Sequence, residues 1–183
     1  MNKLTHAAAK TVFSGVVDYA IGQVNKNPEE AYEKIIDTAE KHMKDFQTGV
    51  NWDYLRRVAC NPEYTLNRYV TSIVKDLHPN VLKTTLMNLG FEALYNGTKT
   101  IREMRKIHNC NIPWIILMDP TSACNLHCTG CWAAEYGNKL NLSFEDMDSI
   151  VTQGKELGVY FYMMTGGEPM VRKKDIIELC RKH

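Results

Sequence analysis

A short apolar run followed at once by three clustered cysteines is the feature that most restricts the fold of this chain. The run NIPWIILMD covers residues 111–119, and Cys124, Cys128 and Cys131 follow it with the spacing C-x3-C-x2-C. A continuous apolar run of this length is typical of a strand buried on both faces of a parallel sheet. We therefore expect a buried strand that leads directly into a loop carrying three thiols.

The same order of strand, loop and helix recurs after the cysteines. Residues 143–157 have helical spacing, with Ser143 as the N-cap and Gly158 as the terminator. The side chains expected to face inward are Phe144, Met147, Ile150, Val151 and Leu157. A second apolar run, VYFYMM, then ends in the turn TGGEP at residues 165–169, and another amphipathic helix begins in KKDIIELCRKH, residues 173–183.

Two strand–helix units in this order are the building block of a parallel α/β sheet or barrel. Both loops follow a strand, so we expect them at the same carboxyl-terminal edge of the sheet, where α/β proteins place their active sites. The cysteine loop and the TGGEP turn are therefore predicted to be neighbours in space.

Residues 1–110 differ, because their pattern is helical throughout and contains no glycine-rich loop or metal-ligand spacing. The expected helices cover about residues 4–24 and 28–43, a shorter piece around 52–58, one that starts at Asn61-Pro62, one over 78–97 that Asn96-Gly97 closes, and a short one after it. The strongest helical periodicity is that of Leu66, Tyr69, Val70, Ile73, Val74 and Leu77. We predict an all-helical region of unknown role over residues 1–110 and an α/β region over residues 111–183.

Composition adds few restrictions. The chain has 183 residues, and 22 Lys and Arg nearly balance 21 Asp and Glu to give a net charge of +1. This balance does not indicate a nucleic-acid-binding surface, and the basic run RKK at residues 172–174 is predicted to be solvated. No apolar stretch is long enough to cross a membrane, and the first residues lack a clean signal-peptide core. We therefore expect a cytoplasmic, reducing location, in which clustered cysteines more often bind metal than form disulfides.

Three thiols on one loop are compatible with more than one metal centre. Thiolates suit zinc, copper(I) and iron–sulfur clusters. A structural zinc site normally takes four protein ligands, and neither His127, Cys110 nor Cys180 is well placed to be the fourth. The cysteines outside the loop, Cys60 included, are expected to be small buried apolar residues. Three cysteines also suit a 4Fe–4S cluster that is held at three corners and has one open iron.

The combination of C-x3-C-x2-C after a first strand and Gly-Gly-Glu-Pro after the second resembles the radical S-adenosylmethionine (radical SAM) superfamily. The resemblance covers roughly residues 111–183. It implies a core that is a partial (β/α)6 barrel, of which this chain contains the first two strand–helix units. Because the chain ends inside an apparent helix, we expect it to be the amino-terminal fragment of a longer protein.

The resemblance also implies roles for the site residues. The three cysteines of the loop would bind three irons of a 4Fe–4S cluster, and SAM would chelate the fourth iron. Gly166, Gly167, Glu168 and Pro169 would form the turn that approaches SAM, with the Glu168 carboxylate near its ammonium group. An electron from the reduced cluster would cleave SAM and leave a 5′-deoxyadenosyl radical that takes hydrogen from an unknown substrate. The implied partner is an electron donor such as a ferredoxin or a flavodoxin.

Other residues of the cysteine loop have less defined roles. Many members of the superfamily have an aromatic residue just before the third cysteine, whereas this chain has Gly130 there and Trp132 just after. Trp132 would line the cluster pocket or belong to the core, Asn125 and Tyr136 would contact the cofactors or shape the loop, and Glu135 is expected to be solvated. The rival interpretation is a non-catalytic protein that binds zinc or an iron–sulfur cluster.

Overall fold

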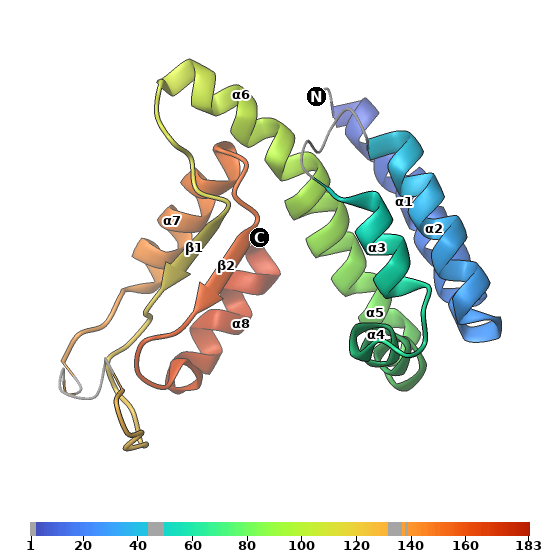
Figure 1. Ribbon diagram of the computed structural model, residues 1–183. Helices are drawn as coiled ribbons and strands as arrows, with labels where there is room; N and C mark the ends of the chain where they lie inside the picture. The colour runs from blue at the N-terminus through green and yellow to red at the C-terminus, as the bar shows by residue number, and fades with distance from the viewer. Residues whose placement is uncertain (1–2, 44–49, 132–136, 138) are drawn as a thin grey trace. The chain divides into compact units, whose positions relative to one another are not determined.

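The computed structural model describes residues 3–43, 50–131, 137 and 139–183 (Figure 1). The chain divides into two compact units, Met1–Met87 (unit 1) and Asn88–His183 (unit 2). This division falls before the change in sequence pattern near residue 111, so the helical residues between the two positions belong to the same unit as the sheet. As a statement about domains, the boundary between residues 110 and 111 stays a prediction.

Unit 1 is helical in its described residues, as the sequence predicted. Its helices are α1 (Lys3–Lys26), α2 (Pro28–Met43), α3 (Trp52–Ala59), α4 (Thr65–Asp76) and α5 (Pro79–Thr85). Val24, Ala31 and Tyr32 form a buried cluster, against which Val74 of α4 packs. The Tyr32 hydroxyl hydrogen-bonds the Thr71 hydroxyl at 2.9 Å, so α2 and α4 are joined by a polar contact beside this apolar cluster.

The predicted start of α4 at Asn61-Pro62 is wrong, because the helix begins at Thr65. Asn61 instead forms a turn, in which its carbonyl oxygen accepts from the Tyr64 N–H at 3.1 Å and its side chain accepts from the Glu63 N–H at 3.0 Å. Asparagine competes for nearby backbone donors in this way and favours turns. The apolar stripe of α4 is buried only in part, since Tyr69 is 62% exposed.

The predicted helix end at Asn96-Gly97 is also wrong. The π-helix η1 (Leu86–Gly97) continues directly into α6 (Thr98–His108), and Gly97 has right-handed helical angles, φ −63° and ψ −48°. The residue that ends α6 is Asn109, in the left-handed conformation with φ 47°. A Cβ at Gly97 would lie 2.6 Å from the Gly158 carbonyl oxygen, so glycine at 97 permits a close approach between segments and does not terminate the helix.

The sheet of unit 2 has the predicted parallel topology. Strands β1 (Ile115–Met118) and β2 (Phe161–Met164) pair in parallel, from Ile115 opposite Phe161 to Met118 opposite Met164. Helix α7 (Phe144–Glu156) connects the strands, and the 3-10 helix η2 (Pro169–Arg172) and α8 (Lys173–Lys182) follow β2 (Figure 1). The described residues therefore contain a small α/β sheet with helices, without a further strand that would extend it toward a barrel.

Helix α7 begins as its sequence predicts. The Ser143 hydroxyl accepts from the Asp146 N–H at 3.0 Å, and the Asp146 carboxylate accepts from the Ser143 N–H at 3.3 Å. This reciprocal capping box satisfies two donors at the helix start. The inward face is also as predicted, with Met147 and Val151 buried and Phe144 and Ile150 packed against them.

One face of the sheet is covered and the other is open. Side chains from β1, α7 and α8 form the buried cluster on the covered face. The cluster consists of Met118, Met147, Val151 and Leu179. On the strands, Leu117 is 56% and Met163 is 44% exposed, so the prediction that the first strand is buried on both faces is wrong for the described residues. Among those residues, no helix combines the length and the apolar character needed to span a membrane.

Candidate metal and cofactor site

The loops after β1 and β2 meet at the carboxyl-terminal edge of the sheet, as the strand order predicts. Backbone pairing continues past the ends of the strands, because the Thr165 N–H donates to the Met118 carbonyl at 2.8 Å. The Gly167 N–H then donates to the Thr121 carbonyl at 3.0 Å, and the Glu168 N–H donates to the Ala123 carbonyl at 2.8 Å. The Gly-Gly-Glu-Pro turn is therefore attached along the first residues of the cysteine loop.

The two glycines of the turn are required by this attachment. Gly166 has φ +98°, a conformation that side-chain-bearing residues rarely adopt, and a Cβ there would lie 2.7 Å from the Asp119 Cβ. A Cβ at Gly167 would lie 2.3 Å from the Ala123 carbonyl oxygen. The sequence predicted that these glycines permit close backbone approach to a cofactor. In the structure, the backbone that lies close to these glycines is that of the segment leading into the cysteines.

The cysteine loop is closed at its base by a short antiparallel contact. The bridge pairs Thr121 with Asn141, and the buried Thr121 hydroxyl donates to the Asn141 side-chain oxygen at 2.6 Å. The Ser122 N–H donates to the Leu140 carbonyl at 2.8 Å. Sequence reasoning missed Thr121 and Asn141, because a threonine and an asparagine in a loop carry no distinctive pattern until the loop is closed.

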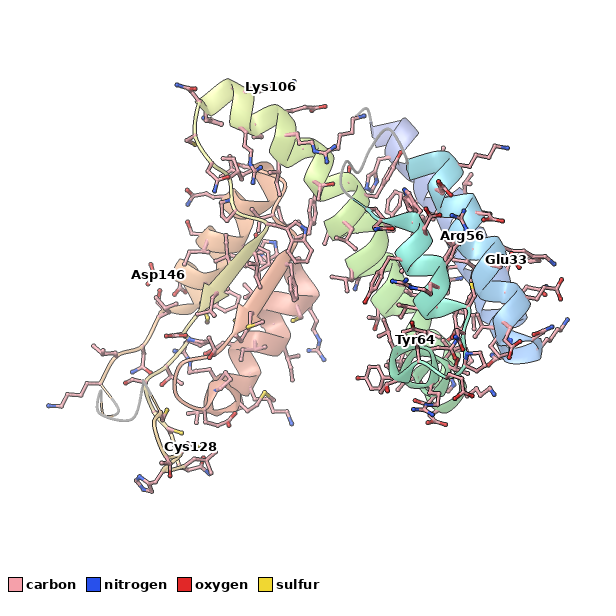
Figure 2. The ribbon with its side chains drawn as sticks, viewed as in Figure 1. Glu33, Arg56, Tyr64, Lys106, Cys128 and Asp146 are labelled. Carbon is pink, nitrogen blue, oxygen red and sulfur yellow. The ribbon has the colours of Figure 1, made fainter. Side chains whose placement is uncertain are left out.

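The two loops line one cavity of about 380 Å³. It brings together the three cysteines predicted for the metal and all the turn residues predicted for SAM except Pro169. These residues are Cys124, Cys128 and Cys131 from the first loop and Gly166, Gly167 and Glu168 from the second. Figure 2 shows Cys128 in the loop that follows β1. The shared cavity follows from the parallel strand order, because the two strands deliver their loops to the same edge.

The backbone of the cysteine loop fits thiolate ligands. The Leu126 N–H donates to the Cys124 sulfur at 3.4 Å, a contact of the kind that the ligand sulfurs of iron–sulfur sites accept. The Cys131 N–H donates to the Cys128 carbonyl at 3.2 Å, which closes a turn between the second and third cysteines. Gly130 lies inside that turn with φ +73°, so the glycine before the third cysteine supplies a left-handed conformation that an aromatic residue would adopt only under strain.

The thiols are accessible, with Cys124 and Cys128 exposed and Cys131 partly buried. Within the described part of the chain, no three potential metal ligands already lie close enough together to hold an ion. The donor set nevertheless fits a thiophilic metal centre, because three soft ligands on one short loop face the same cavity.

The remaining loop predictions divide into three groups. His127 lines the cavity between the first two cysteines, and Asn125 is exposed. Trp132, Glu135 and Tyr136 lie outside the described residues.

The prediction for the cysteines outside the loop is wrong for two of them. Cys110 and Cys180 are exposed, whereas Cys60 is partly buried and packs against the Val24–Tyr32 cluster of unit 1. Both exposed cysteines lie at or near a helix end, where one side of the chain meets solvent.

Glu168 has a local role in the turn. Its Oε1 accepts from the Met170 N–H at 2.9 Å and so caps η2, in which Pro169 is the first residue. A proline at this position loses no hydrogen bond, because the first helical N–H groups have no partner within the helix. A carboxylate has two oxygens and about four acceptor sites, so this cap leaves Glu168 able to accept further donors.

Comparison with known proteins agrees with the site. Residues 118–183 match the Radical SAM superfamily. A stretch of 65 residues is 40% identical to the GTP 3′,8-cyclase of Geobacter sulfurreducens, and it represents 33% of this chain and 20% of that enzyme. The chain thus spans about a fifth of the length of this curated relative. No solved structure gave a significant match. Residues 118–183, which contain both site loops, are therefore similar to the radical SAM superfamily.

Proposed function

We propose that this chain carries the cluster-binding and SAM-binding loops of a radical SAM enzyme, with Cys124, Cys128 and Cys131 as ligands of a 4Fe–4S cluster. The observation that carries the proposal is the shared cavity, in which the three thiols face the Gly-Gly-Glu turn. A zinc site held by the cysteines would not account for the Glu168 carboxylate, which lines the same cavity. The match of residues 118–183 to the superfamily supports the same reading.

When bound, the cluster and SAM together supply the electron transfer and the carbon-centred radical that act on the substrate. The residues of this chain bind and orient these groups. The N–H groups of Gly167 and Glu168 already donate to carbonyls of the cysteine loop. The groups of the turn that remain for SAM are therefore hydrogen-bond acceptors, namely carbonyl oxygens and the Glu168 carboxylate. An ammonium group has only donors, so these acceptors suit the amino group of SAM.

The substrate is left open. The similarity to a GTP 3′,8-cyclase extends over 65 residues and only 20% of that enzyme, so it supports the shared cofactor chemistry and not a particular substrate. We further propose that a small electron-transfer protein, such as a ferredoxin or a flavodoxin, reduces the cluster.

The test is anaerobic reconstitution of the full chain with iron and sulfide. We expect about four irons and four sulfides per chain and an electron paramagnetic resonance spectrum of the reduced cluster that changes when SAM is added. One equivalent of tightly bound zinc, with no spectroscopic response to SAM, would contradict the proposal and identify a non-catalytic metal-binding protein.

A further inference from the structure

A half-buried arginine, Arg172, links the base of the cysteine loop to the segment that follows the Gly-Gly-Glu-Pro turn. Arg172 stands in the basic run that the sequence predicted to be solvated, yet its side chain is only 20% exposed. Its Nη1 donates to the Pro120 carbonyl at 3.1 Å and to the Leu142 carbonyl at 2.7 Å. Its Nε donates to the Asp175 carboxylate at 2.6 Å. These partners of the guanidinium belong to the base of the cysteine loop and to the first turn of α8.

The two carbonyls that Arg172 binds lie at the two ends of the cysteine loop. Pro120 precedes the cysteines and Leu142 follows them, and the Leu142 N–H donates to the Pro120 carbonyl at 3.1 Å. A single nitrogen thus holds both ends of a loop from a position 52 residues beyond Pro120 in the sequence. Arg172 is also the last residue of η2, the short helix that begins with Pro169 of the Gly-Gly-Glu-Pro turn.

We propose that Arg172 is a positioning residue that fixes the cysteine loop relative to the Gly-Gly-Glu-Pro turn, and that Asp175 orients its guanidinium. The inference rests on the proposed function only for its effect on SAM. The contacts near the cavity, Gly167 with Thr121 and Glu168 with Ala123, are single backbone hydrogen bonds. Hydrogen bonds from a charged guanidinium are stronger than neutral ones, and its planar shape restricts direction. Arg172 is therefore suited to set the distance between the thiols and the acceptors of the turn.

The first measurement needs no metal. Amide hydrogen exchange is followed by residue in the full metal-free chain. Arg172→Gln is compared with Arg181→Gln, which alters an exposed arginine of α8, the helix that follows Arg172. We expect exchange at the Leu142 and Gly167 amides to rise about tenfold in Arg172→Gln, because their local opening becomes easier. The Val159 amide, which donates to the Gly154 carbonyl at 2.8 Å, should not change. Unchanged exchange at Leu142 and Gly167 would overturn the proposal.

The second measurement uses the reconstituted chain. We expect Arg172→Gln to bind as much iron as the unaltered chain. The SAM concentration that gives half of the maximal spectral change should be about tenfold higher in Arg172→Gln and unchanged in Arg181→Gln. An arginine that served stability alone would leave this concentration unchanged, and that result would overturn the proposal. Loss of iron from folded Arg172→Gln would overturn it too, because the residue would then be required to form the cluster.

If Arg172→Gln does not fold, Asp175→Asn takes its place in both the exchange and the SAM measurements. We expect a smaller effect in the same direction. No effect in either measurement would overturn the proposal. If the unaltered chain shows no cluster or no response to SAM, the proposed function fails. The exchange measurement then still decides whether Arg172 holds the two loops together.

Discussion

The two compact units use their glycines in different ways. In unit 1, a Cβ added at Gly15 or Gly22 of α1 would meet no atom within 4 Å. In unit 2, a Cβ at Gly154 would lie 2.2 Å from the Tyr162 hydroxyl, and one at Gly167 would lie 2.3 Å from the Ala123 carbonyl. Neither glycine of α1 is therefore required by a close contact, and the packing of unit 1 rests on the apolar side chains that its helices bury. In unit 2, by contrast, glycine is required where the backbone lies close to another backbone segment or to a side chain.

The cysteines show the same difference. Cys60 of unit 1 packs against apolar side chains, and burial, assisted by the nearby Glu33 carboxylate, raises the pKa of its thiol. A raised pKa keeps the thiol protonated and disfavours metal binding. In unit 2, Cys124 and Cys128 are exposed and line a cavity together with Cys131. The comparison therefore favours Cys124, Cys128 and Cys131 over Cys60 as ligands of the proposed cluster.

The largest effect is expected from the cysteines of the cavity. Cys128→Ala should remove most of the iron that the reconstituted chain binds, because the cluster loses one of three protein ligands. Cys60→Ala in unit 1 is the matched control and should bind as much iron as the unaltered chain. Iron and sulfide analysis after gel filtration measures both. Equal iron in the two variants would remove Cys128 from the site and would break the contrast between the units.

A large loss of stability is expected when the two loops are forced apart. Gly167→Ala places a methyl group against the Ala123 carbonyl and should destabilise unit 2 by about 3 kcal/mol, as overpacked sites do. Urea unfolding, followed through nuclear magnetic resonance signals of each unit, should show no change in unit 1. An unchanged midpoint for unit 2 would mean that the loops can separate without cost, and the requirement for glycine would be lost.

Alkaline pH should weaken unit 2 through Tyr162. Its hydroxyl donates to the Val159 carbonyl at 3.0 Å and the Val151 carbonyl at 3.2 Å, and burial, with a contribution from Tyr160, raises its pKa to about 12. An unfolded tyrosine has a pKa of about 10. Stability from this group is therefore complete below pH about 10 and falls as pH rises toward about 12, since the unfolded chain ionises first. Urea midpoints of unit 2 between these pH values should fall more steeply in the unaltered chain than in Tyr162→Phe, and equal slopes would contradict the assignment.

The smallest effect is a gain in unit 1. Gly22→Ala should stabilise α1 by up to about 1 kcal/mol, because alanine loses less conformational freedom in a helix and the added methyl group meets no neighbour. The urea midpoint of unit 1 should rise while that of unit 2 stays constant. A fall in the midpoint of unit 1 would show that its glycines are also required, and the contrast between the units would become weaker.

Much of the fold could be predicted because its signals are local. The Ser143 cap, the inward face of α7 and the parallel order of β1 and β2 all follow from short-range spacing and are confirmed. The errors occur where a distant contact overrides a local preference. Asn96-Gly97 has the composition of a helix end, yet Gly97 keeps helical backbone angles and lies where a Cβ would meet the Gly158 carbonyl oxygen. The first strand is continuously apolar, yet the described helices cover only one face of it.

The candidate site was predictable to a similar degree. The three cysteines and the turn residues of the candidate site were picked out from their motifs, and the structure places the cysteines with Gly166, Gly167 and Glu168 around one cavity. Their cofactor roles stay a proposal. Residues that hold the loops in place were not found, because Thr121, Asn141 and Arg172 act through carbonyls and side chains far away in the sequence.

The sequence by itself determined which chemical groups this protein brings to its site: three thiols on one short loop and a glycine-rich turn with a carboxylate, each after a strand. Tertiary structure alone decided how those groups are held, through Gly167 against Ala123 and through Arg172 against both ends of the cysteine loop. The physical reason is that the sequence states which side chains are present and how they are spaced. Every residue has a backbone carbonyl, so only the folded structure shows which carbonyl a distant donor binds.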